Sequence, residues 1–282
     1  MAISWYPGHM AKARRQLQDQ LARTDVVIEV CDARLPASSR NPDLDDLIRH
    51  KPRILLVNKA DLADPGFTRA WTAHFQAQGI TAIAINSLRM SAKVLPLIER
   101  AASARVESAQ QRGFRRTVRA MVVGVPNVGK STLINLLKGR ATIKTEDRPG
   151  VTRSTQWFRV TPYLELMDSP GMLWPKLEDP LAARRLAFIG SIRDQVHDTA
   201  QLAEQLLSEL MDNHAPLVMQ RYKLDDPTLR GQALLEAICK SRGFLLRGGV
   251  LDMDRAVAAV LDEFRDGRIG RITLESPPAK QQ

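Results

Sequence analysis

The segment Gly124–Ser131 has the residue types and the spacing of a phosphate-binding loop. It reads Gly-Val-Pro-Asn-Val-Gly-Lys-Ser, it follows an apolar run, and it precedes a helical pattern at 131–138. Glycines let such a loop turn so tightly that successive backbone N–H groups face phosphate oxygens, while its lysine reaches the β- and γ-phosphates. We therefore predict that Lys130 contacts phosphate and that the Ser131 hydroxyl ligates Mg²⁺, the alternative being a turn that matches by coincidence. The other predicted nucleotide contacts in and beside the loop are Asn127, Val128, Gly129 and Thr132.

A second segment, Asn58-Lys59-Ala60-Asp61, follows the apolar run 53–57. Ligands of open α/β sheets bind at the carboxyl ends of the strands, which is where this segment is expected. The Asp61 carboxylate can accept hydrogen bonds from N1–H and the 2-amino group of guanine, and Asn58 can hold the loop or the purine edge. Asn86-Ser87 follows another apolar run and can offer a backbone N–H to guanine O6. The alternative for both segments is an ordinary solvated turn.

Two further segments would complete a nucleotide site. Asp168-Ser-Pro-Gly171 follows the apolar run 163–167, so Asp168 can act on Mg²⁺ through its water shell and the Gly171 N–H can bond the γ-phosphate. Thr152 lies between the phosphate loop and Asp168, where a second hydroxyl ligand for Mg²⁺ is needed. The alternatives are a plain Ser-Pro-Gly turn and an ordinary loop threonine. Together the motifs predict a protein that binds GTP or GDP with Mg²⁺.

Short apolar runs alternate with helical patterns through residues 1–174. Such runs are typical of parallel strands covered on both faces, so we predict a doubly wound α/β domain with a mostly parallel sheet. Its expected strands are 25–31, 53–57, 81–85, 119–124 and 163–167. The helices between them are expected at 43–50, 67–78, 93–109 and 131–138, after a basic helix at 10–22.

Residues 175–282 have a different pattern, in which helical segments follow one another without a strand-like run between them. We predict a C-terminal all-helical domain, with helices at 181–189, 199–212, 228–240 and 253–265. The segment 174–180 contains two prolines and is the expected boundary, and 276–282 is expected to be a frayed tail.

Positive charge is concentrated in the first part of the chain. Residues 1–174 hold 26 Lys and Arg against 15 Asp and Glu, whereas 175–282 hold 15 against 16. The basic part predicts a polyanionic partner such as RNA. No run approaches the roughly 18 apolar residues of a membrane span, and two cysteines without a CxxC pattern argue against a disulfide framework or a zinc site. We expect a cytoplasmic protein that does not enter a membrane.

The order of the motifs is unusual for a GTPase. The Asn58–Asp61 and Asn86-Ser87 segments precede the phosphate loop, whereas a standard GTPase runs from that loop through a threonine and DxxG to NKxD. A domain can be permuted in this way when its old termini lie close together and new ones open at a surface loop. With Trp5-Tyr-Pro-Gly-His-Met10 ahead of them, NKAD, GVPNVGKST, RPGVT and DSPG resemble the circularly permuted ribosome biogenesis GTPase A family over about residues 4–174.

The resemblance implies a GTPase that acts late in the assembly of the large (50S) ribosomal subunit. It implies that the GTP form binds the subunit precursor and its 23S rRNA, and that hydrolysis releases the protein. The helical domain suits the C-terminal domain of that family, where it is expected to contact the ribosome or its RNA. Away from the ribosome the protein is expected to be a monomer.

The resemblance also bears on catalysis and on a monovalent cation. Met172 stands after Gly171, where many GTPases have a glutamine that positions the attacking water, and an apolar side chain cannot do so. The family implies that the histidine of the PGHM segment, here His9, takes that role; the alternative is a histidine that packs or contacts RNA. Asn127 matches an asparagine that coordinates K⁺ in related GTPases, and its alternative is a loop-capping asparagine.

Two other functions stay open. One is an RNA-binding scaffold that holds guanine nucleotide structurally and hydrolyses almost none of it, because Met172 cannot position water. The other is a permuted GTPase of small-subunit or tRNA maturation, although the absence of zinc-ligand cysteines argues against relatives that carry a zinc site.

Overall fold

The computed structural model describes residues 7–86, 93–111, 117–139, 157–169, 179–192 and 198–278. The chain divides into two compact units: the first is Met1–Glu178 together with Thr273–Gln282, and the second is Asp179–Ile272. This division corrects the expected assignment of all of 175–282 to the helical domain. The last segment returns to the first unit because Thr273, Leu274 and Glu275 are buried there.

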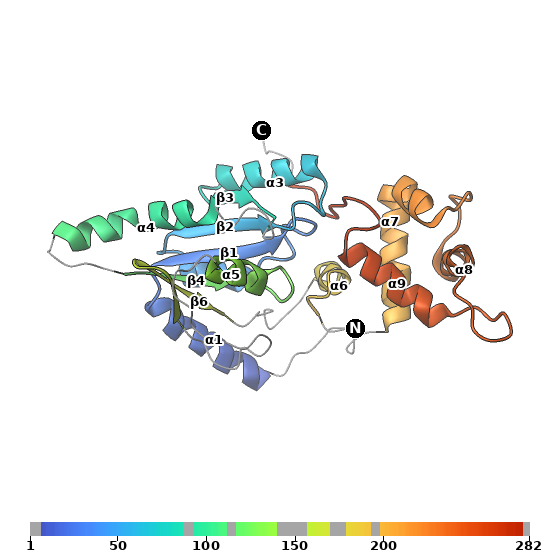
Figure 1. The fold of residues 1–282 in the computed structure, drawn as a ribbon, viewed down its shortest axis with the longest axis horizontal. Coiled ribbons are helices and arrows are strands. Elements are labelled where there is room, and N and C mark those ends of the chain that lie inside the picture. The colour runs from blue at the N-terminus through green and yellow to red at the C-terminus, as the bar shows by residue number, and fades with distance from the viewer. Residues whose placement is uncertain are drawn as a thin grey trace. The chain divides into compact units, whose positions relative to one another are not determined.

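The first unit is built around one six-stranded sheet with the order β3-β2-β1-β4-β6-β5. Figure 1 shows this order from β3 at the top towards β6 below. All neighbouring strands are parallel except β5, which is antiparallel to β6. The strands are β1 (Val26–Asp32), β2 (Arg53–Asn58), β3 (Thr81–Ala84), β4 (Val118–Val123), β5 (Trp157–Thr161) and β6 (Leu164–Asp168). The prediction of a doubly wound, mostly parallel sheet is confirmed.

Strand β5 is the one described strand that the sequence pattern did not reveal. It is only five residues long, and it lacks a continuous apolar run because Arg159 is exposed at its centre. It forms an edge of the sheet, where one side of the strand has no neighbouring strand among the described residues. A short edge strand of mixed polarity carries little of the pattern by which buried parallel strands are recognised.

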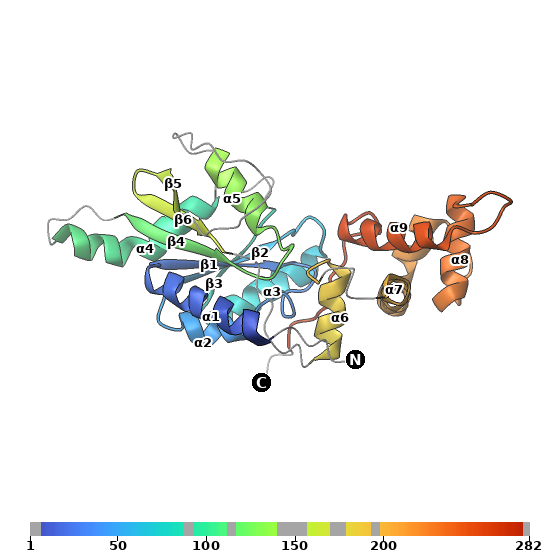
Figure 2. The same cartoon turned by 90° about the horizontal axis from the view of Figure 1, so that it is seen from below.

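Helices cover both faces of this sheet. They are α1 (Pro7–Ala22), α2 (Pro42–Ile48), α3 (Pro65–Ala77), α4 (Val94–Gln111) and α5 (Lys130–Gly139). In Figure 2, α1, α2 and α3 lie on one side of the sheet and α4 and α5 on the other. All seven residues of β1 are therefore buried, and five of the seven are apolar, as is typical of a parallel strand covered on both faces.

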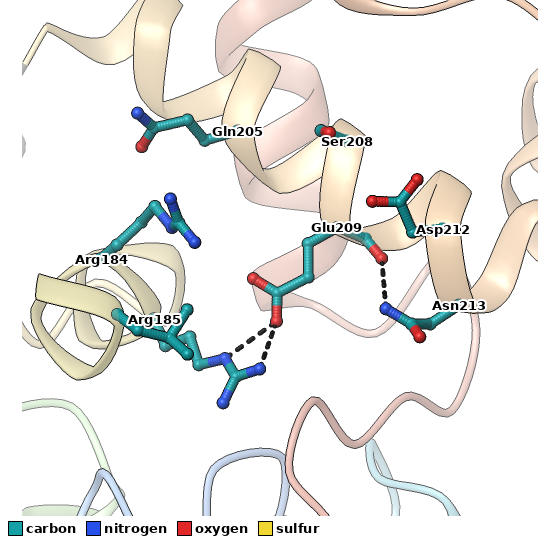
Figure 3. Close-up of a pocket in the computed structure, with 8 residues that line it drawn as sticks. Arg184, Arg185, Gln205, Ser208, Glu209, Asp212 and Asn213 are labelled. Atoms are coloured by element: carbon teal, nitrogen blue, oxygen red, sulfur yellow. Dashed lines mark hydrogen bonds and ion pairs between the residues drawn. The ribbon is translucent and has the colours of Figure 1, made fainter.

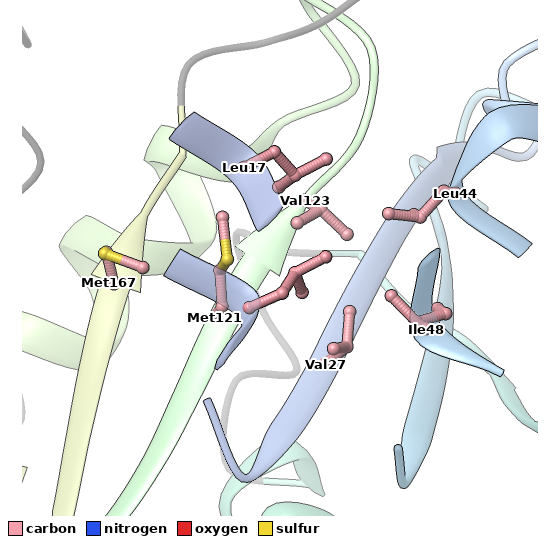
Figure 4. Packing of buried hydrophobic residues seen from close by; sticks show 8 residues of the cluster. Leu17, Val27, Leu44, Ile48, Met121, Val123 and Met167 are labelled. Atoms are coloured by element: carbon pink, nitrogen blue, oxygen red, sulfur yellow. The ribbon is translucent and has the colours of Figure 1, made fainter. Parts of the chain in front are cut away.

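The packing of α1 and α2 against the sheet depends on a small apolar cluster. Leu17 on α1 and Leu44 and Ile48 on α2 point towards β1, β4 and β6 (Figure 4). Leu17 and Leu21 are four residues apart, so they lie on the same face of their helix, and both are 3% exposed. Burying the two contributes about 3–6 kcal/mol. The helix that contains residue 9 is thus anchored to the sheet through its C-terminal half.

The parallel strands bring the predicted motifs to one edge of the sheet. The carboxyl ends of β1, β2, β3, β4 and β6 all lie at that edge, since these strands are mutually parallel. The register pairs Asp32 of β1 with Asn58 of β2, and Val122 of β4 with Asp168 of β6. Segments as far apart in the chain as Asn58 and Val128, which are separated by 70 residues, therefore meet, whatever their order in the sequence.

The second unit is helical, with α6 (Pro180–Phe188), α7 (Thr199–Tyr222), α8 (Gly231–Arg242) and α9 (Met253–Arg265). Helix α7 is ten residues longer than the predicted 199–212, because it continues past a kink at His214, where φ is −140°. Pro216 follows the kink and lacks the N–H that a straight helix would use, which is why the sequence indicated an end there. Within the parts of the chain described here, no helix is both long and apolar enough to cross a membrane.

Candidate functional site

The phosphate-loop segment connects the end of β4 to the start of α5. Gly124 has φ +152°, and a Cβ atom on it would lie 2.4 Å from the carbonyl oxygen of Val30 on β1. Asn127 and Gly129 have φ values of 62° and 98°, so the loop turns sharply before α5 begins at Lys130. The pattern of glycines is thus required both by the turn and by the close approach of β1.

Lys130 lies inside this loop rather than in solvent. Its side chain is 7% exposed, and Nζ donates a hydrogen bond to the carbonyl oxygen of Val125 at 2.8 Å. Burial lowers the pKa of Lys130 to about 8, and the negative charge of Asp168 opposes that shift only in part. A bound phosphate would supply the anion that this buried ammonium group lacks.

Ser131 and Asp168 form a small oxygen-ligand site beside Lys130. Ser131 Oγ donates a long hydrogen bond to Asp168 Oδ2 at 3.4 Å. Asp168 Oδ1 is buried and has no hydrogen-bond partner among the residues that the structure describes. Burial raises the pKa of Asp168, although Lys130, Ser131 and Lys138 lower it. Because a hydroxyl, a carboxylate and phosphate oxygens are what Mg²⁺ prefers, this donor set fits that ion. Thr132, also a predicted contact, is exposed in the same first turn of α5.

The Asn58–Asp61 segment is joined directly to the phosphate loop. Asn58 is fully buried, and its Nδ2 donates to the carbonyl oxygen of Val128 at 2.7 Å. Lys59 has φ 58°, and its Nζ donates to the carbonyl oxygen of Asn127 at 2.6 Å. Of the two roles considered for Asn58, holding the loop is the one that this contact supports.

The same segment also reaches the end of β3. The Ala60 N–H donates to the carbonyl oxygen of Ile85 at 3.1 Å, which brings the segment next to Asn86. The side chain of Asp61 is exposed at the sheet edge, where it is accessible to a base. A carboxylate in that position can accept two hydrogen bonds from guanine.

Two charged residues that the sequence interpretation missed lie beneath this segment. Asp32 and Arg34 are 0% and 1% exposed, and Arg34 Nε and Nη2 donate to the two oxygens of Asp32 at 2.9 and 2.8 Å. Lys59 Nζ lies 3.1 Å from Asp32 Oδ2. Burial alone would raise the pKa of Asp32, but Arg34 and Lys59 hold it well below its usual range. Opposite charges flanking Ala33 at the end of an apolar run were the available signal.

Several predicted site residues lie outside the described part of the structure. They are the side chain of His9 and the whole residues Ser87, Thr152, Gly171 and Met172. The backbone at residue 9 belongs to the first turn of α1. Their predicted roles therefore rest on the sequence and on the family resemblance.

A cavity of about 270 Å³ lies in the second unit, between α6 and α7 (Figure 3). Arg185 Nε and Nη2 donate to Glu209 Oε1 at 2.8 and 2.7 Å across it. Arg184 and Asp212 also line it, so two positive and two negative side chains balance one another. Because this lining favours neither an anion nor a cation, we assign the cavity no ligand.

Comparison with known proteins agrees with the geometry of the first unit. A family profile described as "50S ribosome-binding GTPase" matches residues 119–223, which begins at the strand before the phosphate loop. The chain is 45% identical to Ribosome biogenesis GTPase A of Bacillus cereus, covering 98% of this chain and 95% of that protein. It is 30% identical to the protein of the same name from Thermotoga maritima, with the same two coverages of 98% and 95%.

Solved structures show the same architecture. The structure described as GNP-bound YlqF from T. maritima superposes with a TM-score of 0.68 at 29% identity, covering 94% of this chain and 98% of that one. The GDP-bound structure of the same protein superposes with a TM-score of 0.65, also at 29% identity, covering 93% and 99%.

Proposed function

The chain belongs to the ribosome biogenesis GTPase A family and is a GTPase of ribosome assembly, and from that premise we propose that it acts on a late step of 50S subunit maturation. In this proposal the GTP form binds the subunit precursor through 23S rRNA, and hydrolysis releases it. The protein works in the cytoplasm and is a monomer away from the ribosome.

The observation that carries this proposal is the pair of contacts between Asn58–Asp61 and the phosphate loop. The Asn58 side chain and Lys59 Nζ both donate to loop carbonyl groups, at 2.7 and 2.6 Å. One nucleotide can therefore be held by its base and by its phosphates at once. We assign guanine recognition to Asp61 with Ala60, Asn86 and Ser87. We assign the phosphates to Lys130 with Asn127, Val128, Gly129, Thr132 and Gly171.

The metal assignment follows from the oxygen atoms beside Lys130. We propose that Ser131 and Thr152 ligate Mg²⁺ and that Asp168 holds it through water, since Asp168 Oδ1 is buried without a partner in the described chain. When bound there, Mg²⁺ would supply positive charge that stabilises the negative charge on the phosphate oxygens of the nucleotide. Lys130 adds a second positive charge on those oxygens.

Two further roles are proposed from the family resemblance. Met172 is apolar and cannot orient a water molecule, so we assign the positioning of the attacking water to His9. Leu17 and Leu21 anchor α1 to the sheet, which gives the helix that carries residue 9 a fixed base. We also assign Asn127 to a K⁺ ion beside the phosphates, where a cation would act as an arginine finger does.

The charge distribution supports RNA as the partner. The 26 Lys and Arg against 15 Asp and Glu in residues 1–174 would attract a phosphate backbone. The nucleotide site lies in that same part of the chain. Asp179, the first residue of the second unit, lies only eight residues after Gly171 in the chain. A structural change caused by loss of the γ-phosphate can therefore be transmitted to that unit.

Co-sedimentation with ribosomal particles tests this proposal. We expect the protein to sediment with large-subunit precursors in a non-hydrolysable GTP analogue and to be released in GDP, and Lys130→Ala to abolish the difference. Equal binding in both nucleotides would overturn the switch, and binding to small-subunit particles would redirect the proposal to another step.

GTP turnover separates a GTPase from an RNA-binding scaffold that only stores nucleotide. Phosphate release is measured with and without large subunits, in K⁺ and in Na⁺, for the wild type and for His9→Ala. We expect stimulation by the particle, more release in K⁺, and loss of stimulation in His9→Ala. No stimulation and no effect of His9 would favour the scaffold.

A further inference from the structure

The segment Thr273–Glu275, which follows the last helix of the second unit, is buried in the first unit. The exposed fractions of Thr273, Leu274 and Glu275 are 4%, 9% and 8%, whereas Ser276 is exposed. The segment belongs to no helix or strand. We call it the return segment, and its hydrogen bonds determine what it holds.

Thr273 bridges two loops at the carboxyl edge of the sheet. Its hydroxyl donates to the carbonyl oxygen of Ala33 at 3.3 Å and accepts a hydrogen bond from the Asp64 N–H at 3.1 Å. Ala33 follows β1, and its own N–H donates to the carbonyl oxygen of Asn58 at 2.8 Å. The stretch from Asn58 to Asp64, which contains Asp61, is thus held at both ends. Asp64 bonds the Thr273 hydroxyl group directly, and Asn58 is linked to the same hydroxyl group through Ala33.

The two residues after Thr273 hold the loop that follows β1 and the helix α3. The Leu274 N–H donates to the carbonyl oxygen of Arg34 at 2.9 Å. The Glu275 carboxylate accepts hydrogen bonds from the Ala37 N–H at 2.7 Å and from the N–H and hydroxyl groups of Ser38. The carbonyl oxygen of Glu275 accepts from Trp71 Nε1 of α3 at 2.8 Å.

These contacts continue inward to the nucleotide site. Arg34, whose backbone bonds Leu274, holds Asp32 through two side-chain hydrogen bonds, and Asp32 in turn lies 3.1 Å from Lys59 Nζ. Lys59 then donates to the phosphate loop at Asn127. The links from Leu274 to Lys59 join buried or half-buried groups, and the last one, from Lys59 to Asn127, is exposed. Because every link is a short polar contact, a displacement at one end is carried to the other.

We propose that the return segment is a positioning element for guanine recognition, and that the hydroxyl of Thr273 fixes the loop that presents Asp61 to the base. The inference rests on the proposed role of Asn58–Asp61 in nucleotide binding. The loop that reads the base is held by the part of the chain that emerges from the second unit. A displacement of this segment therefore changes the free energy of guanine-nucleotide binding, and nucleotide binding changes the free energy of that displacement by the same amount.

Three variants of the full-length protein test the proposal. Thr273→Val keeps the shape but removes both hydrogen bonds, Thr273→Ser keeps the hydroxyl, and Ser276→Ala changes an exposed neighbour as a matched control. The dissociation constants of GDP and of inosine diphosphate, which lacks the 2-amino group, are measured for each, together with kcat and KM for GTP.

We expect Thr273→Val to weaken GDP binding about 5- to 10-fold, as loss of two hydrogen bonds that position the loop would do. Binding of inosine diphosphate should weaken less, because it makes fewer contacts with Asp61, so the preference for GDP falls about threefold. KM for GTP should rise while kcat stays within twofold. Thr273→Ser and Ser276→Ala should resemble the wild type.

Unchanged GDP affinity and unchanged preference in a folded Thr273→Val protein would overturn the proposal. Equal weakening of both nucleotides would also overturn it, because a general loss of structure does not discriminate between bases. If the wild type itself failed to prefer GDP over inosine diphosphate, the proposed role of Asp61 would fail instead.

Glu275→Gln provides an independent variant should Thr273→Val not fold. It keeps the size of the side chain but removes the negative charge that accepts hydrogen bonds from the N–H groups of Ala37 and Ser38. We expect the same direction with a smaller effect, about two- to threefold on GDP. A normal preference for GDP in this variant would count against the return segment as a positioning element.

Discussion

The two sides of the proposed nucleotide site differ in how far the protein satisfies its own polar groups. On the phosphate side, formed by Gly124–Ser131 and Asp168, Lys130 Nζ donates to the backbone carbonyl group of Val125, and Asp168 Oδ1 has no hydrogen-bond partner among the described residues. On the base side, formed by Asn58–Asp61 with Asp32 and Arg34, the buried charges pair within the protein.

The pKa directions express the same contrast. On the phosphate side, burial lowers the pKa of Lys130 and raises that of Asp168, so both groups are poorly compensated when charged. On the base side, Arg34 and Lys59 overcome the burial of Asp32 and hold its pKa low, although burial lowers the pKa of Lys59 itself and Asp32 opposes that shift only in part. The base side is therefore a support that exists before the ligand arrives, whereas the phosphate side is completed by phosphate and cation.

Replacing Asp32 should produce the largest loss, and it should be a loss of stability. Asp32→Asn leaves Arg34 and Lys59 without their shared carboxylate, which should lower the free energy of unfolding by about 3 kcal/mol. Urea unfolding of the nucleotide-free protein measures this. Asp46→Asn is the matched control, because its partner Arg49 forms a surface pair with side chains 75% and 69% exposed, and it should change stability by less than about 0.5 kcal/mol. If both variants lowered the free energy of unfolding equally, the buried Asp32 would support the structure no more than a surface charge does.

Replacing Lys130 should instead show as a loss of affinity. Lys130→Ala removes a charged donor to phosphate and should weaken GTP binding about 100-fold. The stability of the nucleotide-free protein should stay the same or rise, because a poorly compensated buried ammonium group is removed. Titration with a fluorescent GTP analogue measures the affinity. Lys138→Ala, at the far end of α5, is the control and should bind within twofold. A large loss of stability in Lys130→Ala would contradict the contrast.

The pH dependence of GDP binding tests the phosphate side of the site, and we expect a change of about tenfold in affinity. The pKa of Lys130 is lowered to about 8 in the folded protein. Phosphate favours its charged form, so GDP affinity should fall about tenfold as pH rises from 7 to 9. In the nucleotide-free protein the sign is opposite: stability should rise between pH 8 and the unfolded value of about 10.4, because the unfolded chain then binds more protons.

Lys130→Arg serves as the control for that measurement, because arginine stays charged throughout this range. Its affinity for GDP should vary much less with pH. If both proteins lost affinity in parallel, the titrating group would lie on the nucleotide or elsewhere in the protein.

The smallest predicted effect concerns Mg²⁺. Asp168→Asn should raise the Mg²⁺ concentration needed for half-maximal GTP hydrolysis about fivefold, since we propose that its carboxylate acts on Mg²⁺ through water rather than directly. Glu165→Gln on the same strand pairs with Arg119 at the surface and should leave the Mg²⁺ dependence unchanged. Chelation of Mg²⁺ should abolish hydrolysis in both. An Asp168→Asn protein with the wild-type Mg²⁺ dependence would remove Asp168 from the metal site.

Local sequence was sufficient for those parts of the site in which the functional residues are consecutive. Gly124–Ser131 and Asn58–Asp61 each carry their chemistry within a few residues, and each follows an apolar run that can only be a buried strand. Because parallel strands end at one edge, their meeting followed from the pattern even in permuted order. The helical second unit followed in the same way from its periodicity, except where α7 continues beyond the kink at His214.

Tertiary structure alone decided which distant groups support that edge. The bond from Asn58 to Val128 spans 70 residues, and the bond from Thr273 to Ala33 spans 240. Nothing in the spacing near Asn58 or Thr273 indicates these partners, because the partners become neighbours only when the strands pair in register and the chain returns from the second unit. The sequence by itself thus determined which residues can recognise the nucleotide, while the fold decided which residues hold them in place, since a hydrogen bond or ion pair depends on distance in space and not along the chain.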